Sequence, residues 1–525
     1  MEMRCGITPF SSDGVNFLKL QLSCRIKGAS TPFIAGIMDK KKYYITAAID
    51  YVNAAPHIGH ALEKIQADVL ARYNRAKGNA VWFLTGTDEH GAKIARAAEA
   101  AGKNPKEFVD ENAEKFRNLK EALHLSWDDF IRTSDEKRHW PGAQRLWMKL
   151  YEAGDLYKKK YRGLYCVGHE AFVTEKDLED GICRDHQKEP EVVEEENWFF
   201  RLSKYGDRIK EEIESERLKI IPESRRNEIL SLIDEGLEDV SFSRPRKDLS
   251  WGIPVPNDSE HTMYVWCDAL ANYITAIGYA EEEAKFWKLW PADLHIIGKD
   301  ILRFHAAIWP GMLISAGLPL PKAIFVHGFI AVDGQKMSKT IGNVIAPVEL
   351  VKKYGTEPVR YYLLREIPSY EDGDFSYKKF EERYNGDLAN GIGNLVARVV
   401  TLGEKLGPMH FDFEKDVEEV IRASCQAEFK EYERHIGELR LNEALIDVWR
   451  LVSIGDKYIN AKKPWAIKDN EQLKNVILNA GYIISTIANL LEPFLPETAE
   501  KIKKQIHIED SVLRIKKGGN LFPRL

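Results

Sequence analysis

The sequence is poor in cysteine and has neither an excess of positive charge nor a long apolar segment. Only 6 of its 525 residues are cysteine, which argues against a small secreted domain held together by disulfides. Acidic residues outnumber basic ones, 81 against 75, so a chain that is basic throughout and coats nucleic acid is excluded, although a local basic patch is not. The most apolar stretch, residues 301–320, contains Arg303, His305, Pro310 and Pro319. We therefore expect it to form buried helix and loop, and we expect no association with a membrane.

The sequence also lacks internal repeats and low-complexity tracts. Its composition, 44% hydrophobic and 30% charged, is that of a globular protein, and its length suggests three or four domains. Residues 1–37 differ, because they have no clear periodicity and a small excess of cationic residues. They are either a weak organelle transit peptide or the product of a mis-assigned start, with Met38 as the true first residue. We favour the second interpretation and expect this segment to lie outside the fold.

The first periodic region predicts a strand, a helix and a second strand. Residues 43–49 are an apolar, β-prone run, as in a buried parallel strand. Apolar residues from Leu62 to Tyr73 recur at helical spacing, and Gly78 is a plausible stop. A second strand is expected over residues 80–84, and the strand–helix–strand order favours a right-handed parallel unit.

This order places His57, Gly59 and His60 at the end of the first strand and the beginning of the helix. Ligands of open α/β sheets bind at that edge, and a helix N-terminus favours phosphate. Two imidazoles three residues apart can both donate to phosphate oxygens, and a glycine lets a base or ribose approach the backbone. Taken alone, the pattern is equally compatible with two helix-capping histidines that bind no ligand.

A lysine-rich loop follows the second group of strands. Residues 294–297 and 323–330 read as buried strands, and Asp333-Gly334 reads as a turn. Lys336-Met337-Ser338-Lys339 comes directly afterwards. Two lysines on such a loop suit a mobile clamp that neutralises charge while a phosphoanhydride splits. By itself the segment would more simply be a solvated lysine-rich turn.

Together the two signals resemble the paired signature of class I aminoacyl-tRNA synthetases. The surrounding sequence is similar to methionyl-tRNA synthetases of the bacterial type. The similarity runs from about residue 43 to residue 465. Further segments that carry it are 51–53, 86–91, 264–270, 298–301 and 360–365.

The resemblance implies an α/β fold with a Rossmann-like parallel sheet. It implies that the sheet is split by an insertion with a zinc knuckle and is followed by an α-helical bundle that binds the anticodon. We expect an N-terminal extension outside the fold, a first catalytic half, the insertion, a second catalytic half, a lysine-loop and stem-contact region and the helical domain. Their predicted bounds are 1–38, 39–152, 153–250, 251–332, 333–385 and 386–525.

The resemblance also implies a methionine–tRNA ligase that uses ATP and Mg²⁺. The methionine carboxylate would attack the α-phosphate of ATP, and the terminal adenosine of tRNA would then take the methionyl group. Because the amino acid supplies the nucleophile, the enzyme mainly positions two anions and spreads charge. His57, His60, Lys336 and Lys339 are the expected catalytic residues. The expected ATP site comprises these four with Gly59, Asp300, Met337 and Ser338.

A methionine site needs an apolar, aromatic-rich slot for the thioether and a carboxylate for the ammonium. By resemblance, Asp88 holds the ammonium, although the helical spacing in this region is also typical of an ordinary core face. The slot is expected to be lined by Ile49, Tyr51, Trp266, Ala269, Leu270, Tyr273, Phe304 and His305. Asp50 departs from the family pattern, in which proline or tyrosine is usual. It adds a carboxylate near Asp88, which could alter ammonium binding.

Two short Cys-x-x-His pairs lie in the insertion. Cys166, His169, Cys183 and His186 suit a tetrahedral structural Zn²⁺ with no position left open for water. His169 is a departure, because a cysteine is common there in the family. The alternative is that both histidines are surface residues and both cysteines are thiols without metal.

The last third of the sequence changes to helical periodicity from about residue 380. Apolar stripes over residues 441–452 and 476–491 predict an antiparallel helix bundle. By resemblance, Trp465 stacks an anticodon base while Asn394 and Arg398 read base edges. The alternatives are a core tryptophan at a helix end and a solvated arginine.

Three other functions remain open at this stage. A sister class I ligase for cysteine, valine or isoleucine is disfavoured by the short insertion and by the lack of a readable catalytic zinc. A tRNA-binding protein that has lost catalysis is disfavoured by the two intact signatures. A zinc-dependent nucleic-acid-binding module is disfavoured by the net charge of −6. We expect a cytoplasmic monomer that binds methionine and tRNA(Met), including initiator tRNA.

Overall fold

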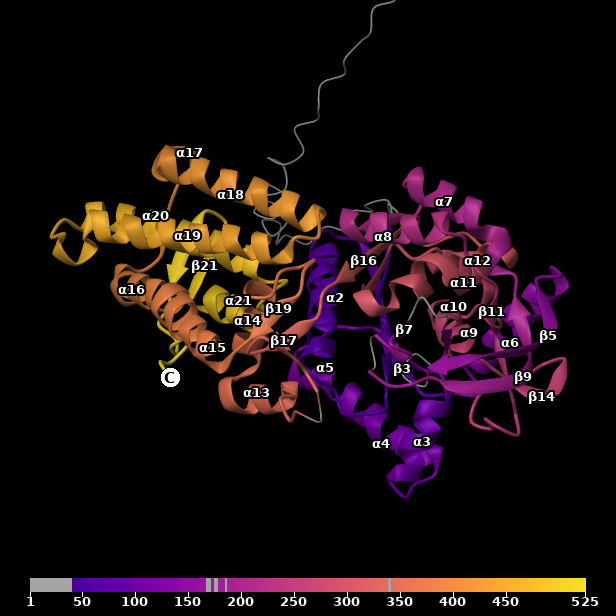
Figure 1. The fold of residues 1–525 in the computed structure, drawn as a ribbon. Helices are drawn as coiled ribbons and strands as arrows, with labels where there is room; N and C mark the ends of the chain where they lie inside the picture. The colour runs from indigo at the N-terminus through magenta and orange to yellow at the C-terminus, as the bar shows by residue number, and fades with distance from the viewer. Residues whose placement is uncertain (1–39, 167–170, 174–177, 185–186, 339–340) are drawn as a thin grey trace, which may run out of the picture. The chain divides into compact units, whose positions relative to one another are not determined.

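The computed structural model describes residues 40–525 except 167–170, 174–177, 185–186 and 339–340 (Figure 1). Two compact units make up this part of the chain, Lys40–Phe375 and Ser376–Leu525. Within it, no helix is both long enough and apolar enough to cross a lipid bilayer. His169, His186 and Lys339, which the sequence analysis singled out, lie outside the described residues.

A seven-stranded sheet with only parallel pairings forms the centre of the first unit. Its order is β10-β16-β15-β1-β3-β2, and β4 also pairs with β3. The strands before and after the insertion form the two sides of one sheet and meet where β1 pairs with β15, as expected for a sheet split by an insertion. The strands are β1 (Lys42–Ala47), β2 (Asp50–Tyr51), β3 (Ala80–Asp88), β4 (Asp129–Arg132), β10 (Lys219–Ile221), β15 (Leu294–Gly298) and β16 (Ala323–His327).

Helices pack on this sheet around one large apolar core that contains, among others, Tyr44, Trp147 and Trp309. The first predicted helix is α2, which ends before Gly78, a residue with φ +88°. The helices are α2 (Ile58–Ala76), α3 (Ala92–Ala100), α4 (Pro105–Arg117), α5 (Leu119–Ala122), α6 (Trp140–Glu152), α7 (Gly206–Glu214), α8 (Glu223–Asp234), α9 (Val265–Leu270), α10 (Asn272–Thr275), α11 (Glu283–Leu289), α12 (Trp309–Ser315), α13 (Pro347–Tyr354) and α14 (Thr356–Arg365).

The segment between the two halves of the sheet forms separate antiparallel structure. One sheet has the order β11-β9-β5-β6, another the order β12-β14-β13, and β7 pairs with β8. These strands are β5 (Leu156–Cys166), β6 (Ala171–Val173), β7 (Leu178–Glu179), β8 (Ile182–Cys183), β9 (Glu191–Phe200), β11 (Val240–Ser241), β12 (Ser243–Pro245), β13 (Pro254–Val255) and β14 (Asp258–Met263).

The strand predicted over residues 323–330 is interrupted. β16 ends at His327, and the chain resumes as β17 (Ile330–Val332), which pairs with β18 (Gln335–Lys336) and β19 (Gly373–Phe375). A Cβ at Gly328 would stand 2.3 Å from the backbone of Glu371, so only glycine allows this close approach. The predicted turn at Asp333-Gly334 is confirmed, because both residues have positive φ and the hairpin closes with two residues.

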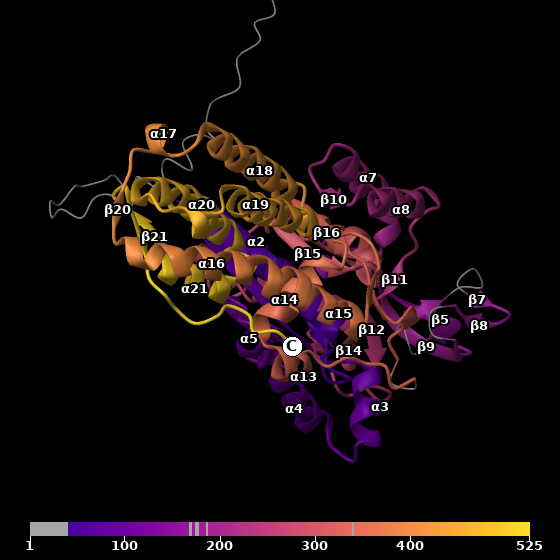
Figure 2. The ribbon, with the colours of Figure 1, turned by 90° about the vertical axis from the view of Figure 1, so that its left-hand side faces the viewer.

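The second unit is mainly helical. α18 (Glu419–Gly437), α19 (Leu441–Lys462) and α20 (Asn470–Leu491) lie side by side (Figure 2), and the apolar stripes predicted for α19 and α20 are largely buried. The other helices are α15 (Tyr377–Arg383), η5 (Tyr384–Gly393), α16 (Asn394–Gly403), α17 (Phe413–Asp416) and α21 (Pro496–Gln505).

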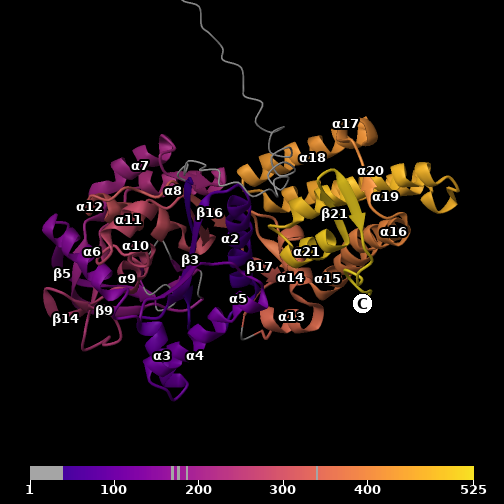
Figure 3. The same cartoon turned by 180° about the vertical axis from the view of Figure 1, so that it is seen from behind.

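A small antiparallel sheet in this unit was not predicted. Its order is β20-β22-β21, and β21 is visible from behind in Figure 3. The strands, β20 (Met409–His410), β21 (Ile506–Glu509) and β22 (Val512–Ile515), have two to four residues each, too few for alternation to stand out in the sequence.

Candidate active site

The first predicted signature caps the helix α2. Nδ1 of His57 accepts a hydrogen bond from the Gly59 amide at 3.1 Å, and Nδ1 of His60 accepts one from the His57 amide, also at 3.1 Å. The two rings stack with their centroids 3.8 Å apart. Because each Nδ1 is an acceptor, the proton of each neutral ring is on Nε2, which can donate to a phosphate oxygen.

Both imidazoles are held in the neutral form by burial. Loss of solvation lowers the pKa of His57 to about 4 and places the pKa of His60 well below its usual range. The site therefore offers two hydrogen-bond donors next to a helix N-terminus without two full positive charges. Such an arrangement suits a phosphate that must be positioned while other groups neutralise its charge.

The structure brings the second signature to the first. The amide of Ile58 donates to the carbonyl of Ile345 at 3.0 Å, and a Cβ built on Gly59 would lie 4.0 Å from Cε of Met337. The loop is closed internally, since the Ser338 amide donates to Oδ1 of Asn343 at 2.8 Å. Lys336 is exposed on this loop. About 280 residues separate the two signatures in the sequence, and the fold makes them one site.

Asp300 lies beside this pair, at the end of β15. A Cβ on Gly298 would stand 2.8 Å from Oδ1 of Asp300 and 3.8 Å from the ring of His327, so these two side chains lie close to the end of β15. Asp300 is open to solvent on one side, yet the protein surrounds it closely enough that desolvation raises its pKa. Its position at the carboxyl end of a parallel strand fits contact with a ribose.

An aromatic group packs on the large apolar core of the first unit. Trp266 stacks on Phe304 with ring centroids 3.8 Å apart, and the edge of His305 meets Trp266 at 6.2 Å. The hydroxyl of Tyr273 and Nε2 of His305 are 2.7 Å apart. A π-helical turn, η4 (Phe304–Ile308), presents Phe304 and His305.

The other predicted methionine residues lie on or next to β2, α9 and β3. Ile49 and Tyr51 lie in and beside β2 and pack on the large core, while Ala269 and Leu270 are buried on α9. Nζ of Lys93 stands 5.6 Å above the ring of Tyr51. Asp88 is buried at the end of β3, where it pairs with Tyr51 across the sheet.

The departure at Asp50 has a structural explanation that the sequence did not reveal. Asp50 is not a spare carboxylate, because its Oδ1 accepts a hydrogen bond from Nζ of Lys64 at 2.9 Å. Lys64 lies on α2, 14 residues further along the chain. Two residues at that distance in the sequence form no helical or strand pattern, so the Asp50–Lys64 pair could be recognised only in the structure.

The sequence analysis also missed two buried polar networks behind the site. Arg132 holds Glu89 with two hydrogen bonds of 2.7 and 2.8 Å. Asp268 is held by Nδ1 of His90 at 2.6 Å and by Nε2 of His139 at 2.7 Å. Glu89, His90 and Asp268 lie within segments already quoted for the resemblance, and their presence there was the signal that the sequence offered.

The structure tests the metal prediction only in part. Cys166 and Cys183 are both buried in one small cluster with Val173. No group of three or more potential ligands occurs among the described residues, and these exclude His169 and His186. Two buried thiols close together fit half of a tetrahedral zinc site.

Arg398 and Trp465 meet in the helical unit. The guanidinium carbon of Arg398 stands 5.2 Å from the centre of the Trp465 ring, which is 55% exposed. Arg398 also donates to Oδ1 of Asn460 at 2.7 Å. Asn394, one helical turn before Arg398 on α16, is exposed. Trp465 is therefore not a core tryptophan, and one face of its ring already has a cationic partner.

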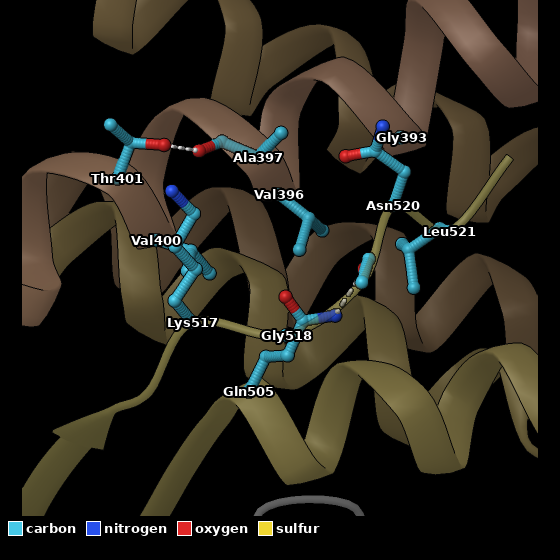
Figure 4. A pocket seen from close by; sticks show the side chains of 11 residues that line it. Gly393, Val396, Ala397, Val400, Thr401, Gln505, Lys517, Gly518, Asn520 and Leu521 are labelled. Atoms are coloured by element: carbon cyan, nitrogen blue, oxygen red, sulfur yellow. Dashed lines mark hydrogen bonds between the residues drawn. The ribbon is translucent and has the colours of Figure 1, made fainter. Parts of the chain in front are cut away.

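A small cavity lies elsewhere in this unit, between α16 and the C-terminal segment (Figure 4). Gln505 lies at its floor and donates to the carbonyl of Gly519 at 3.4 Å. Its volume is about 50 Å³. Since a benzene-sized guest needs roughly 150 Å³, the cavity is too small for a nucleotide base.

Comparisons with known proteins agree with this geometry. The family model described as "tRNA synthetases class I (M)" matches residues 43–183 and 173–400. The model described as "Anticodon binding domain of methionyl tRNA ligase" matches residues 412–518. Together they cover both units.

Individual relatives match over most of their length. The methionine–tRNA ligase of Caldanaerobacter subterraneus subsp. tengcongensis is 44% identical over 512 residues, which cover 93% of this chain and 79% of that protein. The methionine–tRNA ligase of Brucella suis is 43% identical over 477 residues, 89% of this chain and 92% of that protein.

A solved structure resembles the whole fold. The methionyl-tRNA synthetase of Mycobacterium tuberculosis in complex with methionyl-adenylate superimposes with a TM-score of 0.87 at 37% identity. The match covers 92% of this chain and all of that one. On the evidence of the joined signatures, the aromatic group and these matches, the chain belongs to the methionyl-tRNA synthetases, the class I methionine–tRNA ligases.

Proposed function

We propose that the site formed by α2, β15, η4 and the 336–345 loop joins methionine to tRNA(Met) in two steps. The observation that carries this proposal is the junction of the two signatures. The Ile58–Ile345 hydrogen bond and the approach of Met337 to Gly59 support a lysine loop that acts next to the start of α2, and the stacked Trp266–Phe304 pair belongs to the same unit. The similar M. tuberculosis protein was solved with methionyl-adenylate, the product of the first step.

In the first step an oxygen of the methionine carboxylate attacks the α-phosphorus of ATP. The bond from that phosphorus to the bridging oxygen breaks, and pyrophosphate leaves with the electron pair. The Nε2–H groups of His57 and His60 hold the phosphates, and Gly59 leaves room for the adenosine. Most of the rate enhancement then comes from positioning and charge stabilisation, since no enzyme nucleophile is needed.

The charge that develops on pyrophosphate needs cations. Lys336 and Lys339 supply them from the loop, whose backbone at Met337 and Ser338 adjoins the phosphates. Mg²⁺, when bound between the phosphates, adds further neutralisation. Asp300 holds the ribose, and its carboxylate accepts hydroxyl hydrogen bonds.

Methionine binds with its ammonium at Asp88 and its thioether among the aromatic rings. Sulfur packs favourably near ring edges, and the stacked Trp266–Phe304 pair and the Tyr273–His305 pair provide them. A slot of this kind distinguishes amino acids by their shape. Its preference for methionine over a substrate one methylene shorter is therefore limited to roughly 10–200-fold. Homocysteine is therefore the expected wrong substrate.

For the second step, tRNA binds to both units. Trp465 stacks an unpaired anticodon base on the face opposite Arg398, while Arg398 and Asn394 contact base edges. We further propose that initiator tRNA is included, that the enzyme is a cytoplasmic monomer, and that the domain boundaries predicted above hold.

The insertion holds one structural zinc ion through Cys166, His169, Cys183 and His186. The burial of both cysteines in one cluster supports this. Zinc would hold the short β7–β8 hairpin, which has little apolar core of its own. We expect one zinc per chain by elemental analysis, and we expect Cys183→Ser to lose it. Zinc-free protein with full activity and unchanged stability would contradict this assignment.

ATP–pyrophosphate exchange without tRNA tests the central proposal. Methionine, homocysteine, cysteine, valine and isoleucine are compared in the same protein preparation. Exchange led by methionine is expected. Exchange led by another amino acid would overturn the methionine slot, and no exchange with any of them in folded, zinc-loaded protein would favour a tRNA-binding protein without catalysis.

A further inference from the structure

A buried charge cluster joins three segments of the site. It consists of Asp50, Glu63, Lys64 and His327, all of them largely excluded from solvent. Lys64 is the extreme case, with 1% of its surface exposed. A buried ammonium persists only when it is paired and hydrogen-bonded, so its partners must be fixed in the fold.

Lys64 uses all three of its N–H donors. Nζ donates to the carbonyl of Ala48 at 2.8 Å, to Oδ1 of Asp50 at 2.9 Å and to Oε1 of Glu63 at 2.9 Å. The other carboxylate oxygen of Glu63 is 3.1 Å from Nε2 of His327, whose Nδ1 is 2.8 Å from the carbonyl of Gly328. The cluster is thus a continuous hydrogen-bonded chain from Ala48 to Gly328.

Each end of this chain lies on a substrate-binding segment. Ala48 and Asp50 flank Ile49, in the connection from β1 to β2 that carries the methionine side of the site. Lys64 lies one helical turn after His60 on α2, the helix that begins at the phosphate site. His327 ends β16 next to Gly298 and Asp300, where the ribose is expected. One ammonium group therefore links the methionine segment to the ATP segment.

The charges explain why both Asp50 and Lys64 are present. Asp50 departs from the uncharged residues usual at its position, and burial favours its neutral form so strongly that its pKa stays raised, at about 7, even with the Lys64 ammonium beside it. The Lys64 ammonium acts in the opposite direction, and the two carboxylates raise the pKa of Lys64. Without Lys64 the buried Asp50 carboxylate would lose its cationic partner, whereas Lys64 without Asp50 would keep only Glu63 as an acidic partner.

We propose that Lys64 is a positioning residue for methionine activation, because its hydrogen bonds to Ala48 and Asp50 fix the Ile49–Tyr51 segment against the start of α2. This inference rests on the proposed function. Lys64 touches neither substrate and acts through the segment that carries Ile49 and Tyr51.

Kinetics of Lys64→Met test this role, with Lys77→Met as the control. Methionine has nearly the length of lysine but no charge, and Lys77 is an exposed lysine at the C-terminal end of the same helix. We expect Lys64→Met to raise the KM for methionine in ATP–pyrophosphate exchange at least tenfold and the KM for ATP less than threefold. Lys77→Met should change neither. A folded Lys64→Met protein with both KM values within twofold of the parent would overturn the proposal.

Asp50→Asn provides a second, milder test if Lys64→Met does not fold. Asparagine keeps the size and one acceptor oxygen, so the segment remains but the ion pair is lost. We expect the KM for methionine to rise about threefold, and an unchanged KM would overturn the proposal. The double variant should have no higher KM for methionine than Lys64→Met alone, because both residues act in one ion pair. If the two increases in KM multiply in the double variant, the residues act independently, which would contradict the proposal.

The parent protein separates this inference from the proposed function. Exchange by the parent that is led by methionine, together with unchanged variants, would reject the role of Lys64 alone. A parent that does not exchange with methionine would reject the proposed function itself, whatever the variants do.

Discussion

The hydroxyl of Tyr273 donates a hydrogen bond to Nε2 of His305 at 2.7 Å, and Nδ1 of His305 donates to the carbonyl of Ile301 at 2.9 Å. The carbonyl accepts only, so Nδ1 carries the proton and Nε2 is left as the acceptor. This fixes both the tautomer and the orientation of a ring whose edge meets Trp266. The shape of the aromatic group thus depends on one tyrosine hydroxyl.

Tyr273→Phe should therefore weaken methionine binding more than ATP binding. The substitution leaves a buried ring nitrogen without its donor, at a cost of about 1–3 kcal/mol. We expect the KM for methionine to rise roughly five- to tenfold, with the KM for ATP unchanged, as measured by ATP–pyrophosphate exchange. Tyr44→Phe is the matched control, since the Tyr44 hydroxyl donates to the Tyr273 carbonyl instead. Equal effects of the two variants on the methionine KM would refute the orienting role.

Acid should destabilise the first unit through its buried histidines. Burial lowers the pKa of His57 and of His305 to about 4, whereas an unfolded histidine titrates near 6.5. As the pH falls from 6.5 towards 4, the unfolded chain takes up protons that the folded chain does not, so stability is lost in that window. Each residue should cost about 2 kcal/mol at pH 5.

Urea unfolding at pH 7 and pH 5 measures this loss. His57→Gln should reduce the difference in unfolding free energy between the two pH values by about 2 kcal/mol. His410→Gln, at an exposed position of the other unit, should leave the difference as it is in the parent. Equal losses of unfolding free energy between pH 7 and pH 5 in His57→Gln and in the parent would contradict this prediction.

Lys336→Ala should slow adenylate formation without weakening methionine binding. The exposed ammonium lies on the loop that meets the start of α2, and Lys336 is not part of the aromatic group. We expect kcat for ATP–pyrophosphate exchange to fall at least about 100-fold, as for loss of one charge-stabilising donor, and the KM for methionine to stay within threefold. Lys352→Ala removes another exposed lysine, on α13, and should have no effect. Exchange within about twofold of the parent would exclude Lys336 from the reaction.

Gly86→Ala should unfold or severely destabilise the protein. A Cβ at Gly86 would stand 2.0 Å from the carbonyl oxygen of Ile131 on the neighbouring strand β4, and backbone cannot move aside there. The cost should be about 3 kcal/mol or more. Gly437→Ala is the control, because nothing lies within 4 Å of a Cβ there, and alanine should add about 0.5 kcal/mol to the stability of α18. Similar unfolding midpoints for the two variants would contradict the steric argument.

Much of the fold could be predicted because its signals are local. The period of α2, its stop at Gly78 and the Asp333-Gly334 turn each depend on residues within one element, and all three are confirmed. The interruption at Gly328 could not be predicted, because it depends on Glu371, which is distant in sequence. The short β20–β22 sheet could not be predicted for a different reason, because strands of two to four residues are too short to show alternating apolar and polar residues.

The site divides in the same way. The strand–helix order alone predicts that ligands bind at the sheet edge where His57, Gly59 and His60 lie. The bond from Asp50 to Lys64 depends on how the β1–β2 connection crosses α2, and no spacing in the sequence predicts it. The contact of Arg398 with Trp465 is similar, because the two residues come from different helices 67 positions apart.

Trp465→Ala should impair tRNA charging and leave amino-acid activation intact. The ring is 55% exposed, carries Arg398 on one face and belongs to the unit without the ATP site, so its loss removes a stacking platform without opening the catalytic core. A stacked base is worth about 1–3 kcal/mol, so the KM for tRNA(Met) should rise roughly 5- to 150-fold. ATP–pyrophosphate exchange should be unchanged, and Trp287→Ala, which removes another exposed tryptophan on α11, should affect neither assay. If Trp465→Ala charges tRNA(Met) as well as the parent does, the anticodon base stacks elsewhere, and Arg398 serves only to hold α16 against α19.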